Sequence, residues 1–518
     1  MFSDRKSILH LTALLHAHGV RHLVLCPGSR NAPIVHTLNL SGFFECHAVT
    51  DERSAGFQAI GLTLGTGRPA AVCVTSGSAL ANLHPAVAEA YYQRVPLIVI
   101  SADRPAAWIG QMDGQTLPQP NLFGSMLHLA VNLPQGESLE EEWHTNRLIN
   151  EALLAATHRG GGPVHINIPL GEPLYEFHTP SLPTVRVIRR WEGISPDHKR
   201  QIKETLLTCR RPLVLVGQRV PHEALHAPLA ALRRAGVVVL GENLSNLPPS
   251  ALPTAAPESL IAALPEGAEE DYRPDLLITL GGHLISKRMK HYLRQHPPHQ
   301  HWHVSPEGEV ADLFQCLTHC IEASDLDFLQ TLQASLPEKL PTDYAQRWNA
   351  LRPVVDCEGI VPLVLRRMPA HCVLHLANSS AVRLAQGHPL PPGTTVCCNR
   401  GVNGIEGCLS TAVGYAHATP TRLHFILIGD LAFLYDQNAL WANTLPPNLR
   451  ILLLNSGGGR IFDRLPLPPE PSSHALIQAT HQSTARDLAR HYGLHYLTGA
   501  DHLEDFIQSN QPTLLEIV

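Results

Sequence analysis

Short apolar runs and stretches with helical periodicity alternate along most of this chain. Uninterrupted apolar runs are typical of strands that are buried on both faces of a parallel sheet. The helical stretches between them would form the layers that cover the sheets. The pattern therefore predicts an α/β fold made of doubly wound parallel sheets. The runs that we expect to form strands cover residues 22–26, 45–49, 70–75, 96–101, 164–169, 211–217, 236–241, 275–282, 373–377, 394–398, 422–428, 449–454 and 513–518.

Two proline-rich stretches interrupt this pattern, at residues 180–197 and 337–341. We interpret both as linkers, because proline neither donates to a sheet ladder nor continues a helix. At 518 residues the chain is too long for a single hydrophobic core. We therefore expect three doubly wound domains, over residues 1–182, 190–338 and 345–518.

The first and third of these domains share an order of elements. In the first, a helix that begins near Arg53 precedes a strand and a helix with Asn82. In the third, a helix that begins within 401–407 precedes a strand into Asp430 and a helix that contains Asn438. This repetition predicts a duplicated fold. Two such domains that face each other, within one subunit or between subunits, would bind a ligand at the carboxyl ends of their strands.

Polar residues follow two neighbouring strands of the third domain, at the points where the strands end. Asp430 follows one strand, and Asn455 and Ser456 follow the next, 25 and 26 residues farther along. A carboxylate with small oxygen ligands suits a hard divalent cation that holds a diphosphate. The nearby glycines let the backbone approach phosphates closely, and the helix after Asp430 would direct its free N–H groups at them. These glycines are Gly429, Gly457, Gly458 and Gly459.

Glu52 lies in the first domain, where the strand at 45–49 ends and a helix begins. An acidic residue in that position is usually a cap that interacts favourably with the helix dipole. The diphosphate-binding half in the third domain favours another interpretation, because a cofactor anchored there would present its other end to the first domain. Glu52 could then act as a proton donor and acceptor.

Composition narrows the range of partners. The formal net charge of -6, from 39 basic and 45 acidic side chains, gives no reason to expect nucleic acid or an anionic membrane as a partner. The apolar stretch near the start is broken by His10, His16 and His18, so we expect neither a secretory signal nor a membrane span and infer a cytoplasmic protein. The 11 cysteines are scattered through apolar runs, which indicates reduced core thiols.

Several further segments, in order along the chain, carry a resemblance. They are Cys26–Pro33, Asp51–Arg53, Thr75–Asn82, Ser101–Pro105, Asn399–Gly401, Gly404–Ile405 and Gly458–Phe462. Together with the Gly-Asp motif at Gly429 and Asp430, they resemble the thiamine diphosphate enzymes. Among these enzymes, they resemble the branch that joins 2-oxoglutarate to isochorismate in menaquinone biosynthesis. The resemblance spans nearly the whole chain and is weakest between about 185 and 370. It implies that the three domains are a pyrimidine-binding domain, a central Rossmann-like domain and a diphosphate-binding domain.

The resemblance implies thiamine diphosphate with Mg²⁺ or Mn²⁺ as cofactors. Glu52 would hydrogen-bond the aminopyrimidine ring and promote formation of the reactive carbanion, and Ile405 would hold the cofactor in its bent shape. Asp430, Ser456 and the carbonyl group of Gly458 would hold the metal. The other residues that the resemblance assigns to the cofactor are Ser76, Gly77, Asn82, Ser379, Gly429, Leu431, Ala432, Ile461 and Phe462.

The resemblance also implies a reaction, in which 2-oxoglutarate is decarboxylated and the remaining four-carbon unit is added to isochorismate. Such an enzyme is a transferase. Both substrates carry two carboxylates, and arginine suits bidentate binding of carboxylates. The resemblance assigns the 2-oxoglutarate side to Asn378, Ser379, Arg383 and Arg400, of which the two arginines join Glu52 and Ile405 in the catalytic set. It assigns the isochorismate side to Ser29, Arg30, Arg104, Gln115 and Lys287.

The sequence departs from the family pattern in two places. Where the family has a second Asn as metal ligand, Ser456 offers a hydroxyl, a weaker neutral ligand, for which Asn455 or a water could compensate. The chain also ends with the strand at 513–518, whereas family members often continue.

Two alternatives stay open, namely another thiamine diphosphate-dependent 2-oxo acid decarboxylase or carboligase and a cofactor-binding paralogue without turnover. A site made from both cofactor domains predicts a homodimer or homotetramer.

Overall fold

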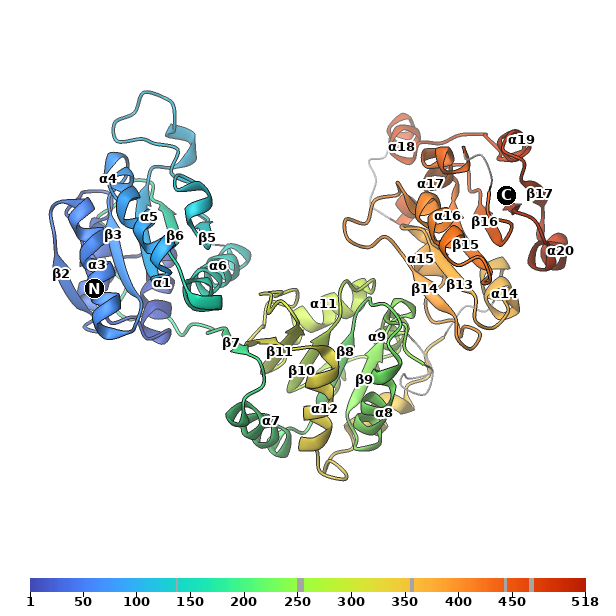
Figure 1. Ribbon diagram of the computed structural model, residues 1–518, viewed down its shortest axis with the longest axis horizontal. Helices are drawn as coiled ribbons and strands as arrows, with labels where there is room; N and C mark the ends of the chain where they lie inside the picture. The colour runs from blue at the N-terminus through green and yellow to red at the C-terminus, as the bar shows by residue number, and fades with distance from the viewer. Residues whose placement is uncertain (137, 249–255, 355–357, 442–444, 465–469) are drawn as a thin grey trace. The chain divides into compact units, whose positions relative to one another are not determined.

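Three six-stranded sheets with helices on both faces make up the protein (Figure 1). The computed structural model describes residues 1–136, 138–248, 256–354, 358–441, 445–464 and 470–518. Contacts divide the chain into two compact units, Met1–Arg190 with Val310–Cys320 and Trp191–Glu309 with Ile321–Val518. The predicted α/β fold of doubly wound sheets is confirmed. The boundaries of the three expected domains stay a prediction.

The first sheet lies in the first unit and is parallel throughout, in the order β2-β1-β3-β4-β6-β5. Its strands are β1 (His22–Leu25), β2 (Glu45–Ala48), β3 (Ala70–Val74), β4 (Leu97–Asp103), β5 (Leu129–Asn132) and β6 (Val164–Pro169). Its helices are α1 (Lys6–Ala17), α2 (Ala32–Leu40), α3 (Glu52–Thr66), α4 (Ser78–Ala81), α5 (His84–Gln93) and α6 (Leu139–Thr157).

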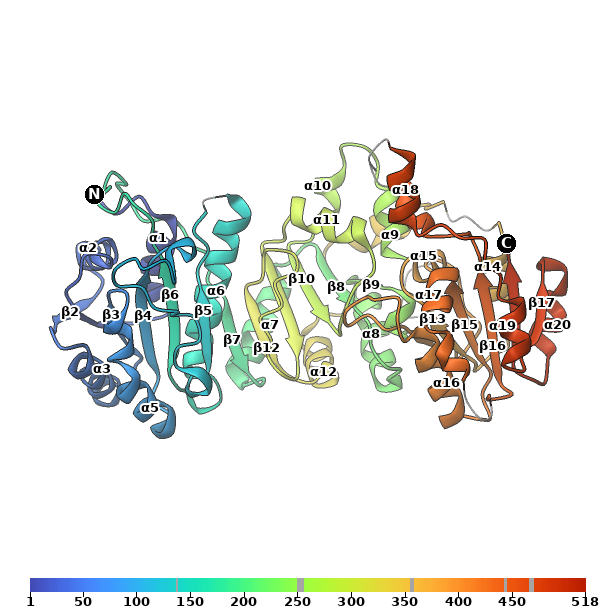
Figure 2. The same cartoon turned by 90° about the horizontal axis from the view of Figure 1, so that it is seen from above.

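Both faces of this first sheet are buried, which explains its uninterrupted apolar runs. Along β1, Leu23 and Leu25 belong to one hydrophobic cluster, and Val24 belongs to the cluster on the opposite face. Helices α1, α2 and α6 contribute to the first cluster, whereas α3 and α5 contribute to the second (Figure 2). Because both faces of the sheet are buried, the loops at the carboxyl ends of its strands are available for polar residues.

The second sheet has the order β7-β12-β11-β10-β8-β9. Its strands are β7 (Arg189–Glu192), β8 (Pro212–Val216), β9 (Val238–Gly241), β10 (Leu276–Leu280), β11 (Gln300–Ser305) and β12 (His319–Glu322). Its helices are α7 (Pro196–Thr208), α8 (His226–Arg234), α9 (Pro257–Ala262), α10 (Glu269–Tyr272), α11 (Lys287–Gln295), α12 (Asp325–Ser335) and α13 (Tyr344–Ala350).

One strand of the second sheet corrects the sequence analysis. The stretch 180–197, which we expected to be a linker throughout, contains β7. The backbone N–H of Arg189 donates to the carbonyl of Thr318 at 2.9 Å, and the buried ring of Trp191 stacks on His198 at 4.6 Å between centroids. The strand escaped notice because it lies at a sheet edge, where exposed polar residues flank a single buried one.

The third sheet is parallel and has the order β14-β13-β15-β16-β18-β17. Its strands are β13 (Val373–Leu376), β14 (Thr395–Cys397), β15 (His424–Gly429), β16 (Leu449–Leu454), β17 (His495–Thr498) and β18 (Thr513–Ile517). Its helices are α14 (Ile360–Arg367), α15 (Ser380–Leu384), α16 (Cys408–Ala418), α17 (Asp430–Tyr435), α18 (Pro471–Gln478), α19 (Arg486–His491) and α20 (Leu503–Gln508).

The second and third sheets are joined within the second unit by packing and hydrogen bonds. Leu244 and Ile285, from loops of the second sheet, are buried in the hydrophobic cluster of the third sheet. Asn246 exchanges two hydrogen bonds with the backbone of Val396, at 2.7 and 2.9 Å. The side chain of Gln218 donates to the carbonyl of Cys398 at 2.8 Å. The loop that follows β14 is therefore anchored to the central part of the chain.

All the predicted strands are present, with ends that differ by up to two residues. The edge strands β5, β7 and β17 and the internal strands β11 and β12 were not predicted. The helix expected within 401–407 begins only at Cys408, and Asn438 lies in a short 3₁₀ helix rather than an α-helix.

The described cysteines are all free, as expected for reduced thiols. None of the helices in the described part of the chain combines the length and apolar character needed to cross a bilayer.

Candidate functional site

Four neighbouring strands of the third sheet lead into four of the predicted site residues. These residues lie at the edge of the sheet that is formed by the carboxyl ends of the strands. The strands β14, β13, β15 and β16 are neighbours and parallel, so their carboxyl ends lie side by side. The segments that follow them carry Arg400, Asn378, Asp430 and Ser456, in that order. This is the edge at which doubly wound sheets bind ligands.

Asp430 is held in one orientation by backbone N–H groups. Its carboxylate is only 4% exposed. Oδ1 accepts from the N–H of Leu431 at 2.7 Å, and Oδ2 accepts from the N–H groups of Ser456 and Gly458 at 2.9 Å each. The carboxylate thus ties the first turn of α17 to the loop that follows β16.

The three predicted metal ligands lie within contact of one another. The Oγ atom of Ser456 is 2.9 Å from the carbonyl oxygen of Gly458 and 3.4 Å from Oδ2 of Asp430. Adjacent ligands of an octahedral Mg²⁺ ion are separated by about 3.0 Å when each metal–oxygen distance is about 2.1 Å. The spacing and the hard oxygen donors therefore fit a Mg²⁺ or Mn²⁺ ion. No group of three His, Cys, Asp or Glu side chains that could hold a metal is found among the described residues, so these three ligands include a single carboxylate.

The side chain of Asn455, which could assist Ser456 as a metal ligand, makes hydrogen bonds to other residues. Its Nδ2 donates to Oε1 of Glu516 at 2.6 Å and to the carbonyl of Ser483 at 2.8 Å. Its Oδ1 accepts from the N–H of Gly457 at 3.2 Å. The amide is buried, and its hydrogen bonds hold the loop that follows β16.

The glycines shape this loop. Gly458 has φ +141°, and a Cβ atom there would lie 2.9 Å from the carbonyl oxygen of Gln478. A Cβ at Gly459 would lie 2.8 Å from the ring of Phe462, which sits with Ile461 in a 3₁₀ turn. Leu431 and Ala432 form the first turn of α17 on the other side. Side chains at the two glycines would displace the segments around Gln478 and Phe462.

Asn378 and Arg400 form the second cluster at this edge. Nη1 of Arg400 donates to Oδ1 of Asn378 at 2.9 Å, and Nδ2 of Asn378 donates to the carbonyl groups of Asn399 and Gly404. Ile405, the next residue, packs against the core of the third sheet. Arg400 is 8% exposed, and its Nε has no partner among the described residues.

Arg383 lies beside this cluster. Its Nη1 donates to the carbonyl of Ser379 at 3.1 Å, one turn earlier in α15. Ser379 has φ +73°, a left-handed conformation that is strained for a non-glycine residue and is common at functional sites. Asn378, Ser379 and Arg383 thus follow β13 closely, and Arg400 contacts Asn378, while their assignment to one substrate stays a prediction.

In the first unit, Glu52 begins α3 but does not cap it. The cap is Asp51, whose side chain accepts from the N–H of Ser54 at 3.1 Å. Oε2 of Glu52 instead accepts from Nδ2 of Asn82 at 3.1 Å. Burial, with the negative charges of Glu52 and Asp51, raises the pKa of the Cys26 thiol to about 12. The capping interpretation thus applies to the residue before Glu52.

Ser76 and Gly77 lie at the end of β3 in the first unit. The buried Oγ of Ser76 has no hydrogen-bond partner among the described residues, which is unusual for a buried polar atom. Gly77 has φ +86°, and its N–H donates to Oε1 of Gln119 at 2.8 Å. Gln119 was missed by the sequence analysis because it belongs to no motif, yet it fixes the turn that carries both residues. The exposed Gln115 approaches the same turn with its backbone.

Two arginines of the first unit also lie near each other. Arg30 is buried, donates to the carbonyl of Leu170 at 2.8 Å and pairs with Glu172 at 3.0 Å. Burial and the neighbouring charge of Arg104 lower the pKa of Arg30. Arg104 lies 3.6 Å from Asp113, and Ser29 is exposed beside Arg30.

Lys287 differs from these residues. It is exposed at the start of α11, and it makes no ion pair among the described residues. A more buried lysine, Lys290, lies three positions farther along the same helix and was missed by the sequence analysis.

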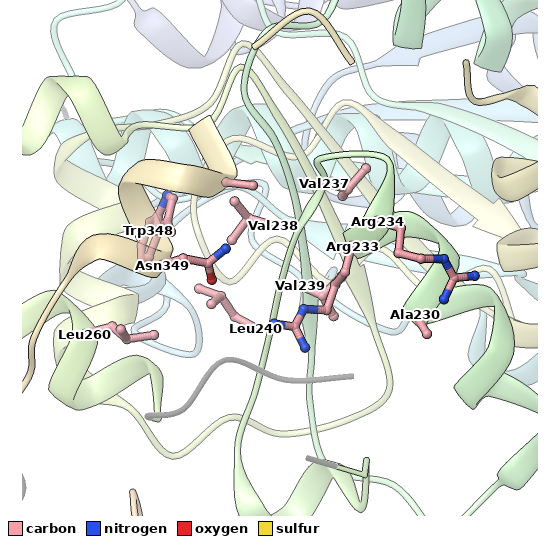
Figure 3. A pocket seen from close by; sticks show the side chains of 11 residues that line it. Ala230, Arg233, Arg234, Val237, Val238, Val239, Leu240, Leu260, Trp348 and Asn349 are labelled. Carbon is pink, nitrogen blue, oxygen red and sulfur yellow. The ribbon is translucent and has the colours of Figure 1, made fainter. Parts of the chain in front are cut away.

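A cavity of about 350 Å³ lies apart from all of these residues (Figure 3). It is in the second unit, with Trp348 and Asn349 on one side and Ala230 and Arg234 on the other. None of the predicted site residues lines it. The candidate site is therefore defined by the strand ends and not by this cavity.

Comparisons with known proteins identify the class of protein to which the chain belongs. Residues 9–124 match the family described as thiamine pyrophosphate enzyme, N-terminal TPP binding domain. Residues 195–352 match the family described as middle domain of thiamine pyrophosphate. Together with three parallel sheets and the Gly-Asp loop, these matches define the chain as a thiamine diphosphate-dependent enzyme.

Curated relatives narrow the class further. A 2-succinyl-5-enolpyruvyl-6-hydroxy-3-cyclohexene-1-carboxylate synthase of Phocaeicola vulgatus is 50% identical over 537 residues, which cover 100% of this chain and 96% of the relative. The protein of the same name from Bacteroides thetaiotaomicron is 49% identical with the same coverage, and that from Desulfotalea psychrophila is 39% identical over 94% of this chain and 93% of its own length. The chain belongs to the family of 2-succinyl-5-enolpyruvyl-6-hydroxy-3-cyclohexene-1-carboxylate synthases, which confirms the resemblance found in the sequence.

Proposed function

We propose that the protein decarboxylates 2-oxoglutarate and adds the remaining four-carbon unit to isochorismate, a step of menaquinone biosynthesis. The observation that carries this proposal is the carboxyl end of the third sheet, where Asn378 and Arg383 follow β13, the neighbour of the strand that leads into Asp430, and Arg400 follows β14, the next strand along. A donor with one carboxylate would not need both arginines. Identity of 50% to a synthase over the whole chain supports the same reaction.

The cofactor end would be held by the loops around Asp430. When bound, thiamine diphosphate supplies a nucleophilic carbon and an electron sink for decarboxylation. Asp430, Oγ of Ser456 and the carbonyl of Gly458 would hold Mg²⁺ or Mn²⁺, which would neutralise part of the charge of the diphosphate. Gly429, Leu431, Ala432, Ile461 and Phe462 would line that end, and Ile405 would support the bend of the cofactor.

The first unit would supply the proton chemistry. Glu52 would exchange a proton with the aminopyrimidine ring, and Asn82 holds its Oε2 so that Oε1 remains for that contact. Ser76 and Gly77 would face the same ring, since the buried Oγ of Ser76 has no protein partner in the described part of the chain. A hydrogen bond to the cofactor would satisfy that hydroxyl.

Each substrate would be bound by its own set of residues, which combines cationic and neutral polar side chains. Arg383, Arg400, Asn378 and Ser379 would bind the 2-oxoglutarate side. The isochorismate side would be bound by Ser29, Arg30, Arg104, Gln115 and Lys287. Substrate carboxylates would offset the mutual repulsion of Arg30 and Arg104, which contributes to the lowered pKa of Arg30.

We also propose a homodimer or homotetramer in the cytoplasm, without membrane insertion or nucleic acid. Glu52 belongs to the first compact unit and Asp430 to the second, and related sites are made from both cofactor domains. Exposed apolar side chains support an interface between copies. They include Phe57 and Leu64 of α3 and Val402 and Trp441 in the third-sheet region.

The test is consumption of isochorismate, followed by ultraviolet absorbance, with thiamine diphosphate and Mg²⁺. We expect loss of isochorismate with 2-oxoglutarate as donor and none with pyruvate. Consumption with pyruvate alone would favour another carboligase. No consumption with either donor, despite confirmed cofactor binding, would favour a paralogue without turnover.

A further inference from the structure

Positive charge gathers in the second unit around the first turns of α11. Lys290 is half-buried there, and the charges that act on it most strongly come from Glu242, Arg400, Arg294 and Arg383. Burial lowers the pKa of Lys290, the three arginines lower it further, and Glu242 opposes them. Lys290 and Arg400 in turn act on Glu242, which is the carboxylate that opposes the three arginines around Lys290.

Glu242 is engaged by the backbone. Its carboxylate, 3% exposed, accepts from the N–H of Ile285 at 2.7 Å and from the N–H of Ser286 at 2.6 Å. No ion pair between Glu242 and Lys290 is present in the part of the chain that the structure describes. Glu242 therefore fixes the segment that leads into α11 without neutralising Lys290 by direct contact.

Lys290 retains hydrogen-bonding capacity. Its Nζ donates to the carbonyl of Leu284 at 2.7 Å. Since an ammonium group has three N–H donors, two have no protein acceptor among the described residues. Arg400 is in a similar position, with Nη1 bonded to Asn378 and the buried Nε unpartnered.

The segment before α11 packs against the third sheet, and Nζ of Lys290 is bonded to the carbonyl of Leu284 within that segment. Ile285 and Leu244 are buried in the hydrophobic cluster of that sheet, which fixes the start of the helix against it. Arg288 instead pairs with Glu258 at 3.3 Å, and Lys287 is exposed. Lys290 is therefore the lysine of α11 whose charge the structure couples to Arg383 and Arg400.

Partly buried cations that repel one another are unfavourable unless an anion joins them. We propose that Lys290 is a third cationic residue of the 2-oxoglutarate subsite, where it binds the distal carboxylate, the one that is not lost as CO₂. Glu242 acts as a positioning residue through the backbone of Ile285 and Ser286. This inference rests on the proposed function, because that function supplies a donor with two carboxylates.

The kinetic test uses the cofactor-loaded enzyme with Lys290→Met. We expect the KM for 2-oxoglutarate to rise about tenfold and the KM for isochorismate to change less than about twofold. Lys290→Arg, which keeps the charge, restores most of the affinity. Lys203→Met, at an exposed position on α7, is the matched control and keeps wild-type values. An unchanged KM for 2-oxoglutarate, or an equal rise for both substrates, would overturn the proposal.

Binding of succinate to the same holoenzyme separates this inference from the proposed function. Calorimetry is expected to give about tenfold weaker binding of succinate to Lys290→Met than to the wild type, at equal thermal unfolding midpoints. Equal affinities, or no succinate binding to the wild type, would overturn the role of Lys290. Failure of the wild type to consume isochorismate would instead overturn the proposed function, and the succinate comparison would still decide the role of Lys290. If Lys290→Met unfolds at a lower temperature, Lys290→Gln is measured in its place.

Discussion

Nη1 of Arg400 donates a hydrogen bond of 2.9 Å to Oδ1 of Asn378, and this contact joins the loop after β14 to the end of β13. The amide nitrogen of Asn378 is held in turn by the carbonyl groups of Asn399 and Gly404. The guanidinium group is therefore oriented by the protein alone. Such preorganisation lowers the cost of binding a carboxylate, because the side chain has little freedom left to lose.

Arg400→Ala should weaken binding of 2-oxoglutarate much more than binding of isochorismate. Loss of a hydrogen bond to a charged group costs about 1.5–3 kcal/mol, so we expect the KM for 2-oxoglutarate to rise about tenfold or more. Steady-state kinetics with each substrate varied in turn measures this, with Arg366→Ala on the exposed side of α14 as a control. Equal changes for the two substrates would mean that Arg400 is assigned to the wrong one.

Glu52→Gln should leave folding intact and remove most of the activity. A glutamine can still accept the hydrogen bond from Asn82, but it cannot exchange a proton with the cofactor. General acid–base catalysis contributes about 100-fold or more, so kcat should fall by at least that factor at an unchanged thermal midpoint. Asp51→Ser, which preserves the cap of α3, should stay active. Turnover near the wild-type level in Glu52→Gln would contradict the proton role.

Much of the fold could be predicted because buried parallel strands have a strong sequence signal. The strand at 70–74 is apolar throughout and the strand at 449–454 is apolar at every position except Arg450, since helices cover both of their faces. The strand at 189–192 has one buried residue among polar ones, and only its pairing at the sheet edge identifies it. Periodicity carries no information about such pairing between distant segments.

Some residues of the candidate site could likewise be predicted from the sequence, and others could not. The closeness of Asp430 to Ser456 and Gly458 could be predicted because each follows the end of a strand with a strong apolar signal. Lys290 and Gln119 could not, because their roles depend on contacts with residues far away in the chain, Arg400 for one and Gly77 for the other. Lys287 was chosen from a short motif, although the structure leaves it exposed.

Ser456 should set the affinity for the metal ion. Its Oγ lies beside the carbonyl of Gly458 and Oδ2 of Asp430, so Ser456→Ala removes one of three neighbouring oxygen ligands. We expect the Mg²⁺ concentration for half-maximal activity to rise about tenfold, and Ser456→Asn to lower it, because an amide carbonyl is the stronger ligand. Mg²⁺ titration of activity and of cofactor-dependent thermal stabilisation measures both. Identical titrations for wild type and Ser456→Ala would exclude Ser456 as a ligand.

A buried histidine pair should make the second unit sensitive to acid. Nε2 of His375 lies 3.0 Å from Nδ1 of His424, and burial lowers the pKa of His375 to about 3 and that of His424 to about 4. Both rings are therefore neutral in the fold, whereas in the unfolded chain they gain protons below about 6.5. The unfolded state then binds more protons, so the free energy of unfolding decreases as pH falls from about 6.5 toward 4, by up to about 1.4 kcal/mol per pH unit for each ring.

Chemical denaturation of the wild type between pH 7.5 and 5, at about half-unit steps, measures this decrease. A matched comparison uses His375→Gln, which removes one titrating ring and should flatten the slope, and His417→Gln, an exposed position on α16 that should not. His424 would still titrate in the first variant, so part of the slope should remain. If His375→Gln and the wild type lose stability in parallel over this range, the acid sensitivity arises from other groups, such as the buried His165, whose pKa burial lowers to about 3.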